Sequence, residues 1–415
     1  MTLADSKEAI SWLARFQGED DRAHAIELIN SILQVSYNDF MNELASLILA
    51  RSEAVGGPVA LYAEREVRAR LGVPNRLFRE SRGKPRRASG GSVHPVSPTR
   101  AYAPEVGSEG LVAQLITELC RQYPKVFINH PGPDRIRKLR VRAFFLITDV
   151  IGSGEQAGKY LEAAWRVHSV RSWHSLGLLR FEVLAYSATS IGEKYVTNHA
   201  CHPAVYYVQP CPTIDTSFTR DAAKQIKALC VKYDPVDHDP SEALGHGGIG
   251  ALLVFAHGAP NNSPRMLHKK GTGWIPLFPA RVTASVRAGF KRDTSLEGIV
   301  AGLKRMKQTR LSKSLWLIAA HPNARLLLLA MAALTKGPRF DEALARKTRL
   351  TIPEIKKLID HAHSLGWIDE RRRVTDEGYR QLEYAKSWRP RKSAIVFDIN
   401  EFYYPQQLRA PRLPR

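Results

Sequence analysis

The residues with the clearest chemical potential lie in the segment 144–157 (FFLITDVIGSGEQA), where an apolar run meets a turn of small residues. The run predicts a buried strand that ends at Asp149, and the turn then leads into a helix. Backbone N–H groups at a helix N-terminus bind anions, and a carboxylate at the strand end can reach ribose hydroxyls. The segment therefore predicts a sugar-phosphate site, in which Asp149 is the catalytic carboxylate and the phosphate is bound by Gly152, Ser153, Gly154, Glu155 and Gln156.

This turn differs from the two common nucleotide-binding loops. It lacks the Lys-Ser/Thr pair of a P-loop, and the glycine pattern of a dinucleotide fingerprint stops at GSG, with Ala157 at the sixth position. An ordinary strand-to-helix turn without a ligand is the alternative interpretation.

Three further side chains are candidates for the same ligand. Arg65 follows the expected strand 58–63 and could contact a pyrophosphate, although an ion pair with a neighbouring glutamate explains it equally well. Asn261 and Asn262 follow the expected strand 251–257, so their amides should face the same edge of the sheet as Asp149. Turn formation is the competing explanation for both asparagines.

The elements that must position these residues indicate an α/β fold. Short, nearly continuous apolar runs alternate with helical patterns from residue 109 to about residue 260. Such strands are typical of a mainly parallel, Rossmann-like sheet that is buried on both faces. The expected strands are 58–63, 125–129, 143–148, 180–187, 204–208 and 251–257.

The sequence also predicts several units along its 415 residues. Apolar positions at helical spacing precede the first strand, and a run rich in Arg, Ser, Gly and Pro follows it. We expect an N-terminal helical extension (1–55), an α/β domain (56–282) with a basic flexible loop (79–108), a basic connector (283–322), a winged helix (323–386) and a basic tail (387–415).

The predicted winged helix carries candidate nucleic-acid contacts. Three short helices followed by a charged turn are the outline of this module. Its third helix would enter a groove and its turn would contact phosphate, or the module would serve dimerisation or docking to a partner protein. The residues concerned are Lys356, Lys357, Arg371, Arg372 and Arg373.

The formal net charge of +21 favours a polyanionic partner, with DNA or RNA first. Four scattered cysteines do not make a disulfide scaffold, and we expect no metal site. The first residues lack a signal-peptide pattern, and no apolar run is long enough to span a membrane, so we expect a cytoplasmic protein without a membrane partner.

Segment 144–157 resembles the phosphoribosyl-pyrophosphate loop of type I phosphoribosyltransferases. It is still more similar to a divergent phosphoribosyltransferase-like family of bacterial conflict and anti-phage defence systems. Further stretches carry the resemblance, which covers about residues 20–282. They are 57–66 (GPVALYAERE), 129–134 (NHPGPD), 171–177 (RSWHSLG), 256–262 (AHGAPNN) and 274–281 (WIPLFPAR).

The resemblance implies roles for single residues. Asp149 matches the second acid of the loop, and Gly152, Ser153 and Gly154 match the positions that surround the 5-phosphate. Thr148 stands where the family has its first acid, and losing a charge-assisted hydrogen bond there would remove about 1.5–3 kcal/mol. The implied ligand is phosphoribosyl pyrophosphate with Mg²⁺, or a nucleotide.

Two functions follow as expectations from the resemblance. The first is an enzyme of a defence system that transfers a phosphoribosyl group or cleaves a nucleotide. The alternative is a non-catalytic nucleotide sensor that binds nucleic acid, or a subunit held by other defence proteins.

Overall fold

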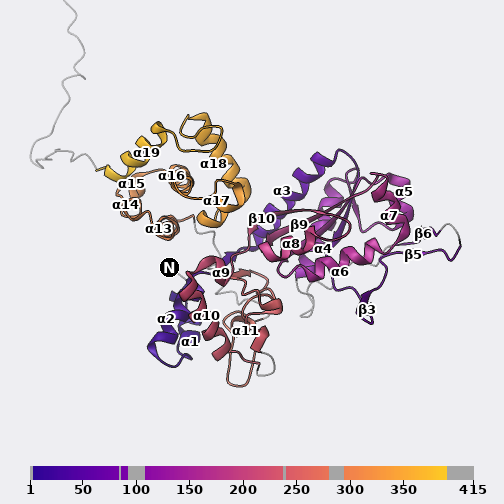
Figure 1. The fold of residues 1–415 in the computed structure, drawn as a ribbon, viewed down its shortest axis with the longest axis horizontal. Coiled ribbons are helices and arrows are strands. Elements are labelled where there is room, and N and C mark those ends of the chain that lie inside the picture. Colours follow the sequence, from indigo (N-terminus) through magenta and orange to yellow (C-terminus); the bar gives the residue numbers. More distant parts are fainter. Residues whose placement is uncertain (1–2, 84–85, 92–107, 237–239, 280–293, 390–415) are drawn as a thin grey trace, which may run out of the picture.

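The computed structural model describes residues 3–83, 86–91, 108–236, 240–279 and 294–389. Figure 1 shows three groups of elements: an α/β domain around a central sheet, the helices α1, α2, α10 and α11, and the C-terminal helices α13 to α19. The predicted tail beyond residue 389, and the parts of the predicted basic loop at 84–85 and 92–107, lie outside the described residues.

The central sheet has five parallel strands in the order β10-β9-β8-β2-β7. Nearly all residues of β2, β8 and β9 are buried, as nearly continuous apolar runs require. The predicted mainly parallel α/β sheet is confirmed. Its strands are β2 (Val59–Ala63), β7 (Phe127–Asn129), β8 (Ala143–Ile151), β9 (Arg180–Ala188) and β10 (Ala204–Pro210).

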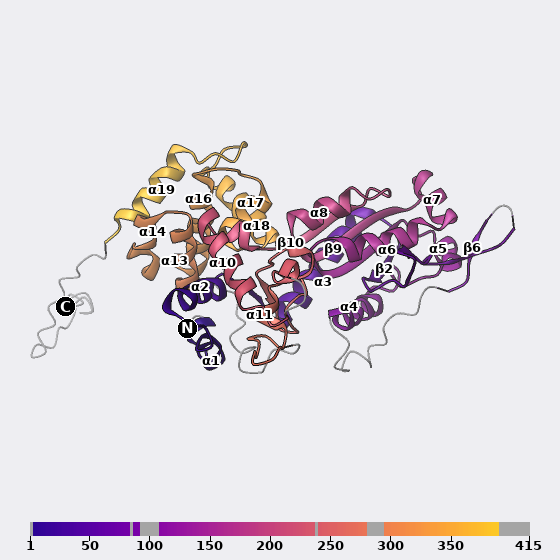
Figure 2. The same ribbon diagram turned by 60° about the horizontal axis from the view of Figure 1, so that its bottom comes forward.

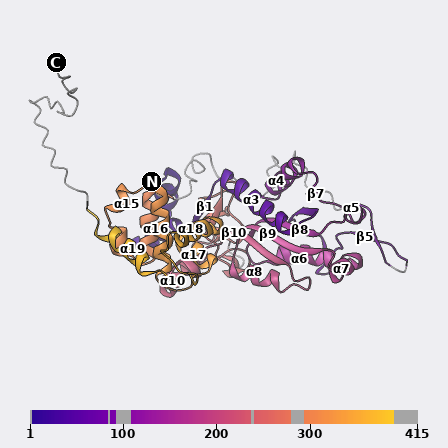
Figure 3. The same cartoon turned by 90° about the horizontal axis from the view of Figure 1, so that it is seen from above.

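Helices cover both faces of this sheet (Figure 3). One face packs against α3 (Tyr37–Val55) and α4 (Ser108–Gln122). The helix α3 lies within the N-terminal extension expected from the sequence, yet its apolar stripe of Phe40, Leu44 and Ile48 packs directly on the strands. The other face packs against α5 (Pro133–Leu139), α6 (Glu155–Trp165), α7 (His168–Ser175) and α8 (Ser190–Thr197).

The strand order reverses between β2 and β8, and we call the region outside the carboxyl ends of these two strands the crevice. The chain passes from β2 to β7 on one side, and then returns to place β8 on the other side of β2. In open α/β sheets, ligands bind outside the carboxyl ends of the strands at such a switch point. The end of β8, where Asp149 lies, borders this crevice.

A second apolar core joins the N-terminus to residues from the middle of the chain. Trp12 and Phe16 contact Trp274 edge to face, with ring centroids 5.9 and 5.6 Å apart. The strand β11 (Leu253–Phe255) pairs with β1 (Leu33–Val35) in a separate two-stranded sheet, so the expectation that 251–257 joins the main sheet is wrong. The helices of this part are α1 (Lys7–Leu13), α2 (Glu19–Asn30), α9 (Ile214–Ser217), α10 (Arg220–Lys232) and α11 (Arg265–His268).

The C-terminal helices share one apolar core. Three of these helices lie in the segment expected to be a basic connector. Its residues Ile299, Leu303 and Leu317 are buried in the shared core, whereas its exposed side is basic. Figure 2 shows α17 and α18 beside β10, which both helices contact. The helices are α13 (Leu296–Arg305), α14 (Thr309–Ser312), α15 (Trp316–Ala319), α16 (Pro322–Leu334), α17 (Asp341–Thr348), α18 (Ile352–Ser364) and α19 (Asp376–Ser387).

The predicted winged helix is present within this core. Thr351 and Glu354 form a reciprocal capping box at the start of α18, and Ile368 pairs with Val374 across the turn that follows. At the other end of the molecule, part of the expected basic loop forms a hairpin of β5 (Arg79–Glu80) and β6 (Ala88–Ser89). Within the described ranges, every helix is too short or too polar to cross a membrane.

Candidate functional site

Asp149 lies in the crevice between β2 and β8. Its Oδ1 accepts a hydrogen bond from the Val150 N–H at 2.7 Å, and its Oδ2 lies 3.6 Å from Nε2 of His257. Burial tends to raise the pKa of Asp149, but interactions with His257, Ser108 and Val150 outweigh burial and hold this pKa below its ordinary value. Asp149 is therefore ionised at neutral pH.

A second carboxyl group, that of Glu64, lies beside this acid. The Glu64 N–H donates to the Ile147 carbonyl at 2.8 Å and so continues the pairing of β2 with β8. Its carboxyl group accepts a hydrogen bond from the Thr148 hydroxyl. Burial raises the pKa of Glu64 to about 8, and the charges of Asp149 and Glu109 act in the same direction. Glu64 is thus largely neutral at pH 7.

The contact between Glu64 and Thr148 places a carboxyl group at the loop position where the family has an acid and this chain has a threonine. Thr148 stands where the resemblance implies a carboxylate, and the structure places the Glu64 carboxyl group against its hydroxyl. The neighbouring strand thereby supplies a carboxyl group to the same part of the crevice. From the sequence, Glu64 was considered only as an ion-pair partner of Arg65. Its position directly after the first strand was the available signal.

The turn after β8 is held by tight packing. Gly154 is the N-cap of α6, with φ 82° and no side-chain cap, and the Glu155 N–H approaches Ser153 Oγ at 3.4 Å. The Thr189 hydroxyl donates to the Gly152 carbonyl at 2.6 Å. The N-cap of α6 therefore supplies no side chain, while Ser153 Oγ accepts from the first N–H of the helix, so an anion bound here would share the turn with that hydroxyl.

The other predicted loop residues differ in their surroundings. Glu155 is half-buried and its carboxylate lies 3.6 Å from Lys159 Nζ and 3.7 Å from His246 Nε2, whereas Gln156 is exposed. A Glu155 carboxylate would repel a phosphate unless the Lys159 ammonium compensates it.

Asn262 lies directly against the turn, although its strand is not part of the main sheet. A Cβ atom on Gly152 would lie 2.0 Å from Asn262 Oδ1. The Asn262 amide donates to the His246 carbonyl at 2.8 Å, and the side chain is buried. Asn261 is exposed, and its carbonyl accepts from the His246 N–H at 2.8 Å. The structure thus gives Asn262 a supporting contact with the turn.

Arg65 reaches the same edge of the sheet. It is half-buried after β2. Burial raises the pKa of Glu109, and the Glu66 N–H, which donates to its carboxylate, and the Arg65 charge oppose this shift only in part. Burial and then the Arg65 charge lower the pKa of His130 to about 4. The structure therefore brings Arg65, Glu109 and the end of β8 together.

His257 lies at the candidate site, although the sequence did not single it out. Its ring stacks on Phe255, with centroids 4.8 Å apart, and meets Phe40 edge to face. Both ring nitrogens are buried and form no hydrogen bond with a described residue, while Nε2 faces Asp149 at 3.6 Å. Its place directly after an apolar strand, within the segment AHGAPNN, was the signal.

A family model described as PRTase-CE matches residues 9–280, which is more than half of the chain. The chain belongs to the PRTase-CE family. A second model, described as wHTH-PRTase associated, matches residues 328–410 of the same chain. Searches of curated proteins and of solved structures each found no match. The expected phosphoribosyltransferase-like domain and its C-terminal winged-helix module are thus confirmed.

The winged helix of this PRTase-CE chain exposes most of its predicted nucleic-acid contacts. Lys356 and Lys357 are exposed on α18, as are Arg371 and Arg373 on the turn. Arg372 differs, because its Nη1 donates to Asp341 Oδ1 at 2.6 Å and to the Arg339 carbonyl at 3.1 Å. Arg372 therefore ties the turn to α17.

Metal-ligating residues are dispersed in the described part of the PRTase-CE chain. No three His, Cys, Asp or Glu side chains there are grouped as a metal site would need. His199 Nδ1 lies 3.1 Å from Cys201 Sγ, and its Nε2 lies 3.3 Å from the Glu162 carboxylate. A divalent cation at the β8 turn would have to share its coordination with a ligand's phosphates.

Proposed function

We propose that this PRTase-CE protein binds phosphoribosyl pyrophosphate or a nucleotide at residues 152–156, and transfers or cleaves the ribosyl group in a bacterial anti-phage defence system. The observation that carries the proposal is the pair of carboxyl groups, Glu64 and Asp149, on adjacent strand ends beside a glycine turn. A topological switch point beside a helix whose N-cap is a glycine suits a ribose 5-phosphate. The cytoplasm is the compartment in which we expect it to act.

The proposed chemistry divides the work between the two carboxyl groups. When the bond from ribose C1 to its leaving group breaks, positive charge develops on the sugar, and the ionised Asp149 would stabilise it. Neutral Glu64 carries a proton that can be donated to a ribose hydroxyl. The leaving group departs with the bonding electrons, and C1 bonds to the acceptor, which releases a proton.

Magnesium would enter this site together with a pyrophosphate. Mg²⁺ is usually bound through one or two carboxylates, phosphate oxygens and water, and Asp149 is the ionised carboxylate at the crevice. When bound, the ion would neutralise charge on the pyrophosphate. Glu64, being largely neutral at pH 7, is the poorer ligand of the two.

Asp149→Asn tests the proposal. Purified protein is incubated with phosphoribosyl pyrophosphate and nucleobases, or with nucleotides, and ribosyl products are quantified. We expect turnover by the wild type, a loss of at least about a hundredfold in Asp149→Asn and wild-type rates in Asp221→Asn, an exposed acid in the first turn of α10. Equal rates in the wild type and Asp149→Asn would disprove the catalytic role.

A second candidate function is a nucleotide-sensing regulator that binds DNA or RNA, alone or as a subunit of a defence complex. It is favoured by Thr148 in place of an acid, by the net charge of +21 and by the exposed Lys356, Lys357, Arg371 and Arg373. In this case the protein would bind ligand without turnover.

Salt dependence distinguishes the regulator from the enzyme. Duplex affinity should fall steeply with salt, and Arg371→Ala/Arg373→Ala should reduce the slope of log K against log salt by up to about two. Arg310→Ala/Lys313→Ala, which removes two exposed cations from α14, is the control with the same charge change. Binding that does not respond to salt would reject nucleic acid as the partner, and co-purified proteins would then point to a defence complex.

A further inference from the structure

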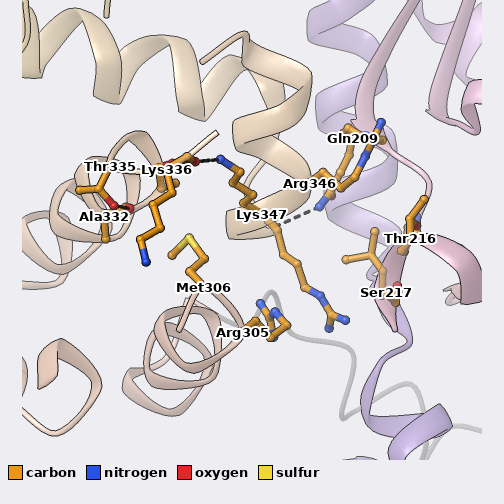
Figure 4. Close-up of a pocket in the computed structure, with 15 residues that line it drawn as sticks. Gln209, Thr216, Ser217, Arg305, Met306, Ala332, Thr335, Lys336, Arg346 and Lys347 are labelled. Carbon is orange, nitrogen blue, oxygen red and sulfur yellow. Dashed lines mark hydrogen bonds between the residues drawn. The ribbon is translucent and has the colours of Figure 1, made fainter. Parts of the chain in front are cut away.

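A hollow of about 490 Å³ lies between the α/β domain and the C-terminal helices, away from the crevice that holds Asp149. Figure 4 shows Met306 and Lys336 on one side and Thr216 and Ser217 on the other. Side chains from β10, α9, α13, α16 and α17 therefore contribute to a single cavity.

The charged residues that line this cavity are all basic. Its lining residues, all of them in the described part of the chain, include no aspartate or glutamate. Thr216, Ser217 and Thr335 add hydroxyl groups. Cations that lie close together repel one another, so the arrangement favours an anionic occupant. The basic side chains are Arg305, Lys336, Arg346, Lys347 and Arg349.

Two of these cations are held in place by the fold. Lys347 Nζ donates to the Ala333 carbonyl at 3.1 Å and to the carbonyl of Lys336 at the end of α16. Burial lowers the pKa of Lys347, and the charge of Arg339 lowers it further. Arg349 Nη2 donates to the Ser31 carbonyl at 2.9 Å. The positions of Lys347 and Arg349 are therefore fixed before a ligand binds. Lys336 and Arg346 are exposed and extend the basic surface of the cavity.

The cavity also has an apolar side and spans two domains. Leu33, Pro210 and Pro212 give it an apolar surface that suits a flat base or sugar, while Met306 lies on the side of Lys336 and Arg305 (Figure 4). The Gln209 amide on β10 donates to the carbonyl of Arg349, the C-cap of α17, at 3.0 Å, so this wall of the cavity joins the two domains. An occupant would contact both at once.

We propose that this cavity binds a nucleoside oligophosphate and that binding fixes the winged helix against the α/β domain. Its volume lies in the range of small-molecule sites, roughly 300–1,000 Å³, and is too small for a nucleic-acid duplex. Phosphates contact Lys336, which follows α16, and Arg346 of α17, and the base lies against Pro210 and Pro212. The site is separate from the proposed ribosyl site and does not depend on turnover there.

Calorimetric titration of the full chain with ATP, GTP and inorganic triphosphate tests this site. Lys336→Ala/Arg346→Ala removes two exposed cations and should raise the Kd of the nucleotides at least about tenfold. Arg310→Ala/Lys313→Ala makes the same charge change outside the cavity and should leave the Kd unchanged. Asp149→Asn should also retain this binding, which separates the cavity from the crevice.

Hydrogen exchange provides a second readout. Nucleotide binding should slow exchange in α17 and β10 of the wild type, and Lys336→Ala/Arg346→Ala should lose this protection. Equal losses of affinity in the two double variants, or protection confined to the β8 turn, would overturn the proposal. Inorganic triphosphate that binds as tightly as ATP and GTP would overturn the nucleoside part.

Discussion

Gly152 shows how a missing side chain shapes the candidate site. Asn262 occupies the space that a Cβ atom would need, so the turn and the segment after β11 are in direct contact. Of the site residues, Asp149 and the glycines could be predicted because they follow a recognisable strand. Glu64 and His257 could not be identified as site residues from the sequence, because this depends on which strand ends lie next to each other in the fold.

Gly152→Ala should weaken ligand binding at the turn and lower the melting temperature. The added Cβ would lie 2.0 Å from Asn262 Oδ1, so either the turn or the buried Asn262 must move. Gly83→Ala is the matched control, because a Cβ there meets nothing within 4 Å. Thermal melts and titration with phosphoribosyl pyrophosphate measure both effects. Unchanged affinity in Gly152→Ala would mean that the turn does not contact the ligand.

Glu64 should make stability depend on pH. Its pKa is about 8 in the folded chain against an ordinary value of 4.5, mainly because it is buried. Below about pH 4.5 both states hold the proton, and between pH 4.5 and 8 only the folded state does. The free energy of unfolding should therefore fall as pH rises across this window, by up to about 1.4 kcal/mol per pH unit.

Denaturant unfolding of Glu64→Gln at pH 5 and pH 8 checks this dependence. The variant should be more stable relative to wild type at pH 8 than at pH 5, because its amide does not ionise. Glu118→Gln, on the exposed side of α4, should show the same pH profile as wild type. Parallel profiles for wild type and Glu64→Gln would show that Glu64 ionises normally.

Among the elements, α18 depends on its N-terminal cap. The Thr351 hydroxyl accepts from the Glu354 N–H, and the Glu354 carboxylate accepts from the Thr351 N–H at 2.9 Å. Thr351→Ala should destabilise the C-terminal domain by about 1 kcal/mol, whereas Thr351→Ser keeps the oxygen and most of the stability. Amide exchange within α18 reports the difference. Equal exchange in both variants would mean that the cap contributes nothing.

The elements also show which predictions a sequence supports. The strands β2, β8 and β9 were predictable because their apolar runs are bounded by turns. The pairing of β11 with β1 could not be predicted, because it joins residues more than 200 positions apart. Pairing of β11 with the main sheet would bury the same apolar side chains. The helices α13 to α15 were not predicted, because α14 and α15 are single turns and the basic residues of α13 and α14 suggested an exposed connector.

At the scale of the whole molecule, the docking of the winged helix has a consequence for the sheet. The strand β10 is an outer strand, and α17 and α18 lie against it. An uncovered outer strand offers unpaired backbone groups to other chains. A chain ending at residue 293 should therefore self-associate, which light scattering would detect, while the full chain stays dispersed. The C-terminal module would then protect the chain against aggregation, independently of the ligand or partner that it binds.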